Sequence, residues 1–192
     1  MSRIILASQS PRRRELLGQM GFQDFEIIPA VGEEEADSSL PITEYVEQLA
    51  LHKAAEVAAR VNDPDAIVIG ADIIVVHHDE ILGKPRNQAH AFQMLSNLSG
   101  SRHMVYTGVA LIQGERRITG HEGTKVRFCA LTEQEILAYI ATGEPMDKAG
   151  AYGIQGRGGL LVDSIEGDFY NVVGLPICRL SRMLAGIGIK CL

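Results

Sequence analysis

Short blocks of apolar residues alternate with polar segments along the first third of the chain, and each block predicts a strand or a helix. The apolar run 3–8 ends at polar residues, which is typical of a buried strand. Ser10 and Pro11 then predict the start of a helix, because serine is a good N-cap and proline fits the first helical turn. A second strand is predicted over 24–31. Thr43 is expected to cap a long helix that continues to an Asn-Asp-Pro sequence.

The middle of the chain contains longer apolar stretches. Residues 66–76 are almost continuously apolar and β-branched, which predicts a central strand, although Asp72 interrupts it. A helix is predicted over 88–98, and two long strands are predicted over 103–113 and 116–128. Helices and strands alternate early and an antiparallel strand pair follows, so the pattern predicts an α/β fold with a mixed sheet.

The last third predicts a helix, a loop and a further helix. Thr132 is expected to cap a helix that ends near residue 142, and a glycine-rich loop covers 148–159. A short strand pair and a terminal helix from about Pro176 complete the pattern. Neither an internal repeat nor a linker separates these segments. We therefore expect a single domain over residues 1–192, which could comprise two lobes.

The charge of the chain narrows the classes of partner. The 192 residues include 24 acidic and 18 basic ones, a net charge of −6, and an acidic surface repels nucleic acids and anionic membranes. The apolar runs are shorter than the roughly 20 residues that a membrane-spanning helix needs. Three widely spaced cysteines favour a reducing compartment. We expect a cytoplasmic protein that binds neither nucleic acid nor membrane, and that binds anions only at a local basic site.

The most basic segment opens the first predicted helix. Arg12, Arg13 and Arg14 occupy the first helical turn, where the positive end of the helix dipole disfavours cations. A phosphate that bridges the free backbone N–H groups and the guanidinium groups would explain the arginines, and we favour this interpretation. The alternative is a solvated basic turn that pairs with Glu15 or with an acidic loop.

Two charged residues stand where the pattern is otherwise apolar. Asp72 interrupts the central strand, and a buried carboxylate needs a cation, a metal or hydrogen-bond donors. It is either a functional group or a structural aspartate at a strand end. Lys53 lies on the apolar face of the long helix that follows Thr43, so its ammonium group either extends to the surface or points at an anion.

Further candidates lie on predicted turns. Lys84 follows the strand that bears Asp72, although a lysine on a turn is most often solvated. The acidic run 33–35 could hold a hard cation together with Asp72, or be a solvated loop. Gln155 is a lone side-chain amide among glycines and could bond the edge of a nucleobase. The His-His-Asp-Glu run 77–80 is interpreted as a polar hairpin tip, because adjacent strand side chains point to opposite faces.

An ordered set of motifs extends over nearly the whole chain, from about Leu6 to Pro176. The motifs are Leu6-Ala-Ser-Gln-Ser-Pro-Arg-Arg13, Gly70-Ala-Asp72, Leu82-Gly-Lys-Pro85, Leu98-Ser-Gly100 and Asp147-Lys-Ala-Gly-Ala-Tyr-Gly-Ile-Gln-Gly156. This set resembles the Maf family, whose members are cytoplasmic house-cleaning nucleoside triphosphate pyrophosphatases.

The resemblance implies a fold and a reaction. The fold would be an elongated mixed α/β sheet flanked by helices, with two lobes around a cleft, similar to the inosine triphosphate pyrophosphatases and often assembled as a homodimer. The reaction would be hydrolysis of a nucleoside triphosphate to the monophosphate and pyrophosphate with a divalent cation, Mg²⁺ or Mn²⁺. The glycine-rich loop resembles that of the branch acting on dTTP and UTP rather than the branch acting on 7-methylguanosine triphosphate.

The resemblance also implies roles for individual residues. Asp72 would be the catalytic base and, with Glu34 or its neighbour Glu33, a metal ligand. Arg12 and Gln155 would govern the choice of substrate. The groups that would handle the phosphates and the metal are Ser8, Arg13, Glu34, Lys53 and Lys84.

One position in the substrate-binding set departs from the family pattern. The usual Gly-Ala-Asp-Thr is Gly-Ala-Asp-Ile here, so Ile73 lacks a hydroxyl that could contact the substrate or Asp72. Because the family has also been associated with inhibition of septum formation in bacteria, the alternative function is a nucleotide-sensing regulatory module with weak or no catalysis. A pyrophosphatase for 7-methylguanosine triphosphate is a further alternative.

Overall fold

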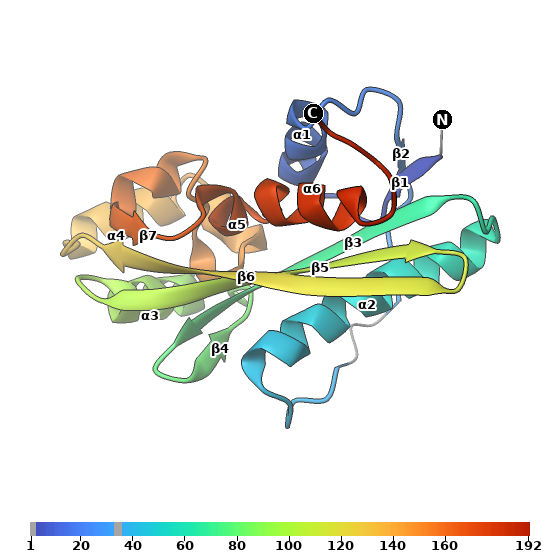
Figure 1. Ribbon diagram of the computed structural model, residues 1–192. Coiled ribbons are helices and arrows are strands. Elements are labelled where there is room, and N and C mark those ends of the chain that lie inside the picture. Colours follow the sequence, from blue (N-terminus) through green and yellow to red (C-terminus); the bar gives the residue numbers. More distant parts are fainter. Residues whose placement is uncertain (1–2, 33–35) are drawn as a thin grey trace. The chain divides into compact units, whose positions relative to one another are not determined.

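The computed structural model of the chain describes residues 3–32 and 36–192 (Figure 1). Helices and strands alternate over most of its length. In chain order the elements are β1 (Ile4–Leu6), α1 (Pro11–Gln19), β2 (Glu26–Ile27), α2 (Ile42–Val61), β3 (Ile67–His77), β4 (Glu80–Leu82), α3 (Gln88–Leu98), β5 (Arg102–Gln113), β6 (Arg116–Phe128), α4 (Glu133–Ile140), η1 (Glu144–Asp147), η2 (Ala149–Ala151), η3 (Arg157–Leu161), β7 (Val162–Glu166), α5 (Phe169–Val173) and α6 (Ile177–Ala185), where η marks a 3-10 helix.

The strands form a mixed sheet. Among the described residues it has seven strands, in the order β2-β1-β3-β5-β6-β7 with β4 paired to β3. β1 runs parallel to both of its neighbours, with Leu6 opposite Ile27 on one side and Ile69 on the other. β4 and β7 run antiparallel to β3 and β6. The predicted α/β fold with a mixed sheet flanked by helices is therefore confirmed.

The chain divides into two compact units. Unit 1 comprises the described residues up to Asp72 together with 107–122 and 174–192, and unit 2 comprises 73–106 and 123–173. The strands β3, β5 and β6 each contribute residues to both units. The single domain over 1–192 stays a prediction.

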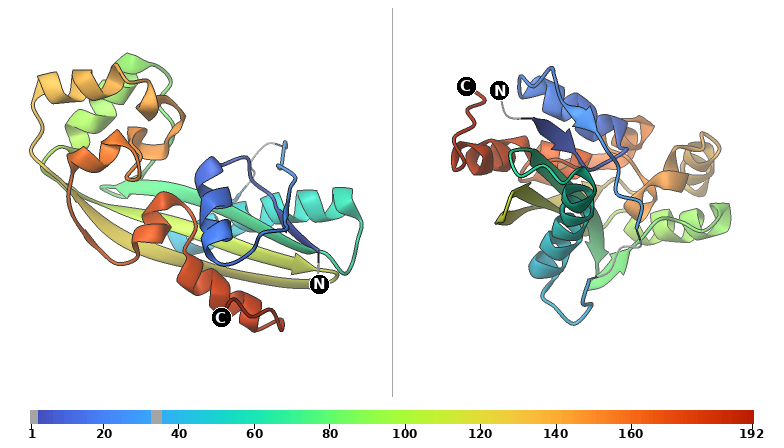
Figure 2. Two further views of the ribbon diagram at one scale, coloured as in Figure 1. Left: turned by 90° about the horizontal axis from the view of Figure 1, so that it is seen from above. Right: turned by 90° about the vertical axis from the view of Figure 1, so that its right-hand side faces the viewer.

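In unit 1, α2 and α6 cover opposite faces of the sheet (Figure 2). On the α2 face, a Cβ atom on Gly70 or Gly108 would collide with the backbone of the helix. On the α6 face, a Cβ atom on Gly120 would lie 3.3 Å from Sδ of Met183. The two glycines of β3 and β5 thus let α2 lie directly against the strands, and the apolar side chains that fill the contact are mostly alanine and valine.

The start of α2 differs from the prediction and its end agrees with it. The helix begins at Ile42 with Pro41 as its N-cap, and no side chain caps it, so the cap predicted at Thr43 is wrong. The fixed φ of proline, −51° here, leads the chain into the helix without a capping hydroxyl. At the other end, Asn62 takes a left-handed φ of 50° and its N–H group bonds the carbonyl of Ala58, which closes the helix.

Other predicted elements had mixed outcomes. The helix over 88–98, the two long central strands and the caps at Ser10 and Thr132 are confirmed. The strand predicted over 24–31 shrinks to the two residues of β2, because its only neighbour among the described residues is the three-residue β1. The strand pair predicted near the end is the single strand β7, which pairs with β6, and the short helix α5 was missed. Within the described ranges, no helix is long and apolar enough to cross a membrane.

Unit 2 is built around an apolar cluster in which α3 and α4 pack against the sheet. Ile73 packs against this cluster. The predicted loop over 148–159 contains the short helix η2 and the start of η3, and it is anchored because Ala151 and Tyr152 are buried in the cluster. The other large side chains of the apolar cluster include Leu95, Leu98, Phe128, Ile136, Tyr139 and Leu161.

Candidate active site

An ion pair between Lys53 and Asp72 lies inside unit 1. The ammonium group of Lys53 donates a hydrogen bond to Oδ1 of Asp72, and only 7% of Asp72 is exposed. Of the two possibilities left open for Lys53, the structure selects the second, because its side chain points at an anion. A lysine that lies among apolar residues in the pattern is therefore the partner of the one carboxylate that interrupts the central strand.

The strand period and the packing of α2 bring this pair together. Gly70 and Asp72 are two residues apart in β3, so both face the same side of the sheet. That side is covered by α2, and a Cβ atom on Gly70 would meet Ala54 of this helix. Lys53 lies between Ala50 and Ala54, the two residues of α2 nearest to Gly70, and its side chain reaches Asp72 two residues further along β3.

The basic segment at the start of α1 contains a buried arginine. Nη1 of Arg13 donates to Oγ of Ser8 at 3.1 Å, and its Nε donates to the carbonyl oxygen of Gly174 at 2.8 Å. Oγ of Ser8 also accepts the N–H group of Ser10 at 3.2 Å, and Ser10 in turn caps the helix. Arg13 is 7% exposed. The predicted residues Ser8 and Arg13 thus form a connected cluster at the N-terminus of α1.

Arg12 lies beside this cluster and is half-buried. Its guanidinium group makes no hydrogen bond or ion pair with residues 3–32 or 36–192. The first turn of α1 holds no acidic residue either. A cation at the positive end of a helix is unfavourable unless an anion joins it. The environment of Arg12 therefore suits a bound phosphate.

The helix α2 also holds the segment that leads to the acidic run. Oε1 of Glu56 accepts the N–H group of Val31 at 2.9 Å, and Oε2 accepts that of Gly32 at 3.0 Å. These N–H groups lower the pKa of Glu56 below its ordinary value. Glu33 and Glu34, the predicted metal ligands, follow in the sequence and lie outside the described residues. Glu56 was missed because a glutamate on the polar side of a helix gives no signal in the sequence.

In unit 2, the turn that carries Lys84 contacts the glycine-rich loop. The N–H group of Gly150 donates to the carbonyl oxygen of Gly83 at 3.1 Å. Gly150 and Ala151 both take a left-handed backbone, with φ of 68° and 60°, and such strain in a buried alanine is typical of functional loops. Lys84 is exposed and has no hydrogen-bond or ion-pair partner among the described residues, so its ammonium group is accessible to a ligand.

Gln155 is exposed in a turn of the same loop. The backbone on either side of it is bonded by two side chains from outside the loop, Tyr139 of α4 and Glu144 of η1. Neither residue was predicted to matter, because each lies more than ten residues from the groups that it bonds. Gln155 therefore projects from a turn whose backbone is held.

A buried histidine, His103, contacts Tyr152 of the glycine-rich loop. Nε2 of His103 and the hydroxyl of Tyr152 are 2.7 Å apart, and both rings pack edge to face against each other and against Phe128. Burial lowers the pKa of His103 to about 4, so it is neutral at pH 7. Because 49 residues separate His103 from Tyr152, no local pattern predicts this pair.

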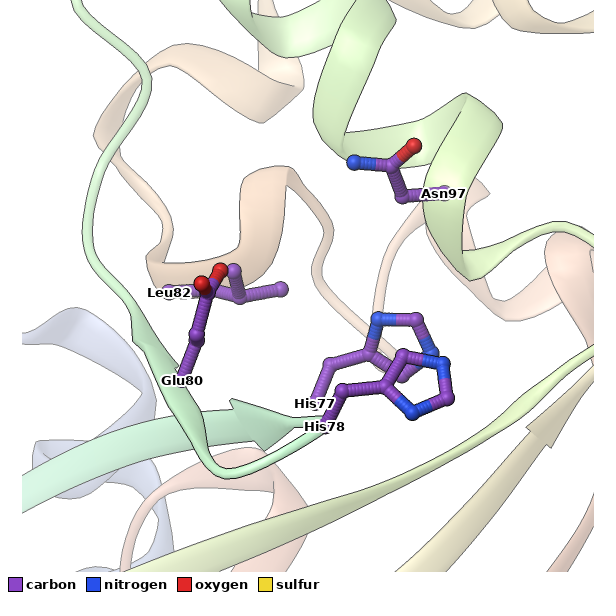
Figure 3. A pocket seen from close by; sticks show the side chains of 5 residues that line it. All are labelled: His77, His78, Glu80, Leu82 and Asn97. Carbon is purple, nitrogen blue, oxygen red and sulfur yellow. The ribbon is translucent and has the colours of Figure 1, made fainter.

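The polar hairpin tip that the sequence predicted joins β3 to β4. His78 and Asp79 have φ of 49° and 63°, as a tight turn between antiparallel strands requires. Nε2 of His77 lies 3.1 Å from Oγ of Ser101. No group of three His, Cys, Asp or Glu residues suited to a metal occurs in the described part of the chain. Figure 3 shows the pocket beside the tip, which is lined by His77, His78, Glu80, Leu82 and Asn97.

Comparison with known families decides the relationship of this chain. The family model described as Maf-like protein matches residues 3–187. The chain belongs to the Maf-like protein family. The resemblance drawn from the five motifs is therefore confirmed, and it extends over both units.

Named relatives of the Maf-like chain are similar over nearly their full length. A dTTP/UTP pyrophosphatase of Symbiobacterium thermophilum is 53% identical over 188 residues, which cover 98% of this chain and 95% of that protein. One of Moorella thermoacetica is 53% identical over 191 residues and covers 98% of this chain and 97% of the relative. One of Bacillus cereus is 54% identical over 184 residues, with 96% and 95% covered.

A solved structure resembles the Maf-like chain in fold. A HAM1 protein from Coxiella burnetii superimposes with a TM-score of 0.50 and 16% identity, covering 68% of this chain and 75% of that one. At this identity the likeness concerns the arrangement of helices and strands alone.

Proposed function

We propose that this chain hydrolyses nucleoside triphosphates, with dTTP and UTP preferred, to the monophosphate and pyrophosphate. Membership of the Maf-like family and relatives named dTTP/UTP pyrophosphatase support the proposal. The observation that carries it is Asp72, a buried carboxylate paired with Lys53. The ammonium group fixes the position of the carboxylate, and a carboxylate fixed beside a reacting water can accept its proton.

In the proposed reaction, a water oxygen attacks the α-phosphorus. The bond between this phosphorus and the oxygen that bridges to the β-phosphate breaks, and pyrophosphate leaves. Asp72 accepts the proton that the attacking water loses. Lys53 orients the carboxylate and contributes positive charge where negative charge develops.

The phosphates bind cationic groups in this proposal. Ser8 and Arg13 form a fixed cluster at the N-terminus of α1, and Arg12 lies next to it without a protein anion in the described ranges. Backbone N–H groups at this helix end add to the attraction. Lys84, exposed on its turn, binds a further phosphate oxygen. Together these cations stabilise the charge of the departing pyrophosphate.

A divalent cation, Mg²⁺ or Mn²⁺, fits the donor set of unit 1. Asp72 offers anionic oxygen, the donor that hard cations prefer, and Mg²⁺ commonly uses one or two protein carboxylates together with water and substrate phosphates. Asp72 would hold the ion with Glu34 or Glu33, which follow the segment that Glu56 bonds. When bound, the ion would lower the pKa of water and neutralise phosphate charge.

Gln155 completes the proposal as the residue that contacts the base. Uracil and thymine present the same polar edge, an N–H donor beside a carbonyl acceptor. The amide of Gln155 carries one acceptor and one donor, which can match that edge.

The test measures pyrophosphate release from dTTP, UTP, CTP, GTP and 7-methylguanosine triphosphate, with Mg²⁺ or Mn²⁺ and with EDTA as the control. The expected result is metal-dependent release that is fastest with dTTP and UTP. Binding of nucleotide without release from any of the five would overturn the proposal and favour the regulatory module instead.

A further inference from the structure

The selectivity proposed for Gln155 requires more than its amide. Rotation of the amide by half a turn exchanges its donor and its acceptor. The amide can therefore favour uracil over cytosine only when its distance and direction to the base are set, which requires first that the backbone carrying Gln155 is fixed. Gln155 is exposed, and the glycines at 153, 156 and 158 give its own segment little rigidity.

Two side chains outside this segment hold its backbone at both ends. The hydroxyl of Tyr139 accepts the N–H group of Gly153 at 3.2 Å, two residues before Gln155. The carboxylate of Glu144 accepts the N–H groups of residues 157 and 158 at 2.9 and 3.0 Å, just after Gln155. The turn is thus fixed by hydrogen bonds to backbone groups on each side of the amide.

The two side chains are themselves connected. Tyr139, which is 4% exposed, donates its hydroxyl proton to Oε1 of Glu144 at 2.9 Å. Partial burial raises the pKa of Glu144, but the N–H groups of Gly158 and Arg157 outweigh it and keep this pKa below its ordinary value. Both oxygens of Glu144 therefore act as charged acceptors, whose hydrogen bonds are stronger than neutral ones.

The glycines beside Gln155 are fitted to these groups. A Cβ atom on Gly156 would lie 2.5 Å from Oε2 of Glu144. A Cβ atom on Gly158 would lie 2.6 Å from the hydroxyl of Tyr139. A side chain at 156 would push the carboxylate of Glu144 away, and one at 158 would also collide with the backbone of Gly153, so glycine at both positions lets the backbone reach its acceptors.

We propose that Glu144 and Tyr139 are positioning residues for base selection, which fix the turn of Gln155 so that its side chain reaches a pyrimidine from one fixed backbone position. This inference rests on the proposed function. Neither residue has to touch the substrate, because both act through the backbone that carries Gln155.

The test compares Glu144→Ala, Glu144→Gln and Tyr139→Phe with a matched control, Glu135→Ala. Glu135 also accepts a backbone N–H group, that of Thr132 at 2.7 Å, but it does so at the opposite end of α4. Steady-state kinetics with UTP and CTP give kcat and KM for each protein. Hydrogen exchange read by mass spectrometry reports the protection of the segment 153–158.

Glu144→Ala is expected to speed exchange in 153–158 and to reduce the ratio of kcat/KM for UTP over CTP about tenfold, mainly through the KM for UTP. Tyr139→Phe is expected to act in the same direction. Glu144→Gln, which keeps one acceptor oxygen, should fall between Glu144→Ala and the unmodified chain. Glu135→Ala should lower Tm without changing the ratio. An unchanged ratio despite faster exchange, or an equal change in the control, would overturn the inference.

Failure of the proposed function is visible separately, as the absence of pyrophosphate release by the unmodified chain. In that case the ratio of dissociation constants for UTP and CTP, measured by calorimetry, takes the place of the kinetic ratio. The same comparison of variants then supports or overturns the positioning role. If the unmodified chain binds UTP and CTP with equal affinity, it does not select between the two bases, and the inference is wrong.

Discussion

The ammonium group of Lys53 bonds the carboxylate of Asp72, so one ion pair connects α2 to β3 within unit 1. Both side chains are largely buried, so each contributes to the electrostatic environment of the other. The losses of unfolding free energy caused by substituting the two residues should therefore not be additive. The effect of each substitution on kcat can be measured separately.

Asp72→Asn tests the proton acceptor. The amide has nearly the shape of the carboxylate but accepts a proton poorly, so we expect kcat for pyrophosphate release to fall by a factor of about 10² or more. Asp79→Asn, at the exposed hairpin tip, serves as the control and should keep its rate. A kcat equal to that of the unmodified chain would show that Asp72 does not accept the proton.

Lys53→Met tests the pair as a contribution to stability. It leaves the carboxylate of Asp72 buried without its partner, and we expect the free energy of unfolding to fall by about 2 kcal/mol. Adding Asp72→Asn removes the unpaired charge, so the double variant should lose less than the sum of the two single losses. Urea unfolding of the four proteins measures these terms, and strict additivity would argue against coupling.

The pH dependence of stability should report His103. Its pKa is about 4 in the folded chain against 6.5 as the ordinary value, so between these limits the unfolded chain binds a proton that the folded chain does not. Stability contributed by the neutral imidazole is present above pH 6.5 and is lost as the pH falls toward 4. We expect a loss of about 2 kcal/mol between pH 7 and pH 5 from this group.

His103→Gln isolates that contribution. The variant lacks the imidazole, so the difference in unfolding free energy between it and the unmodified chain should narrow as the pH decreases. Urea unfolding at pH 7, 6 and 5 measures the difference. A constant difference across this range would mean that the imidazole is not held neutral by burial.

Ile73→Thr examines the departure from the family motif. Ile73 packs against the apolar cluster of unit 2, so threonine should cost about 1 kcal/mol of unfolding free energy through lost apolar contact. We expect kcat to change by less than about threefold, because Asp72 and its partner Lys53 are unaltered. A much larger gain in kcat would instead indicate that the missing hydroxyl limits the reaction.

Local chemistry explains which parts of the fold could be predicted. The cap at Ser10, the capping box at Thr132 and the helix over 88–98 depend on neighbours within a few residues, and these were correct. The cap predicted at Thr43 failed because a proline two residues earlier already starts the helix. The strand predicted over 24–31 was too long. A strand extends only as far as the strand it pairs with, and the sequence does not show that this partner is the short β1.

The candidate site shows the same division. Asp72 and Lys53 could be predicted as candidates because each interrupts an apolar pattern, and the structure brings them into contact. Glu56, Glu144 and His103 break no pattern, because their partners lie far along the chain and only the folded backbone brings them near. A contact between residues far apart in the chain leaves no local pattern of residue types, whereas a helix cap does.

The tight fit of Gly156 and Gly158 against Glu144 and Tyr139 bears on how selectivity could change over generations. A larger residue at 158 would collide with backbone and one at 156 would displace the Glu144 carboxylate, whereas Gln155 is exposed between the two bonded ends of the turn. Under the proposed role of Gln155, a single codon change at 155 would exchange the group that contacts the base while the supporting turn keeps its hydrogen bonds. Such a scaffold lets new nucleotide preferences arise one substitution at a time.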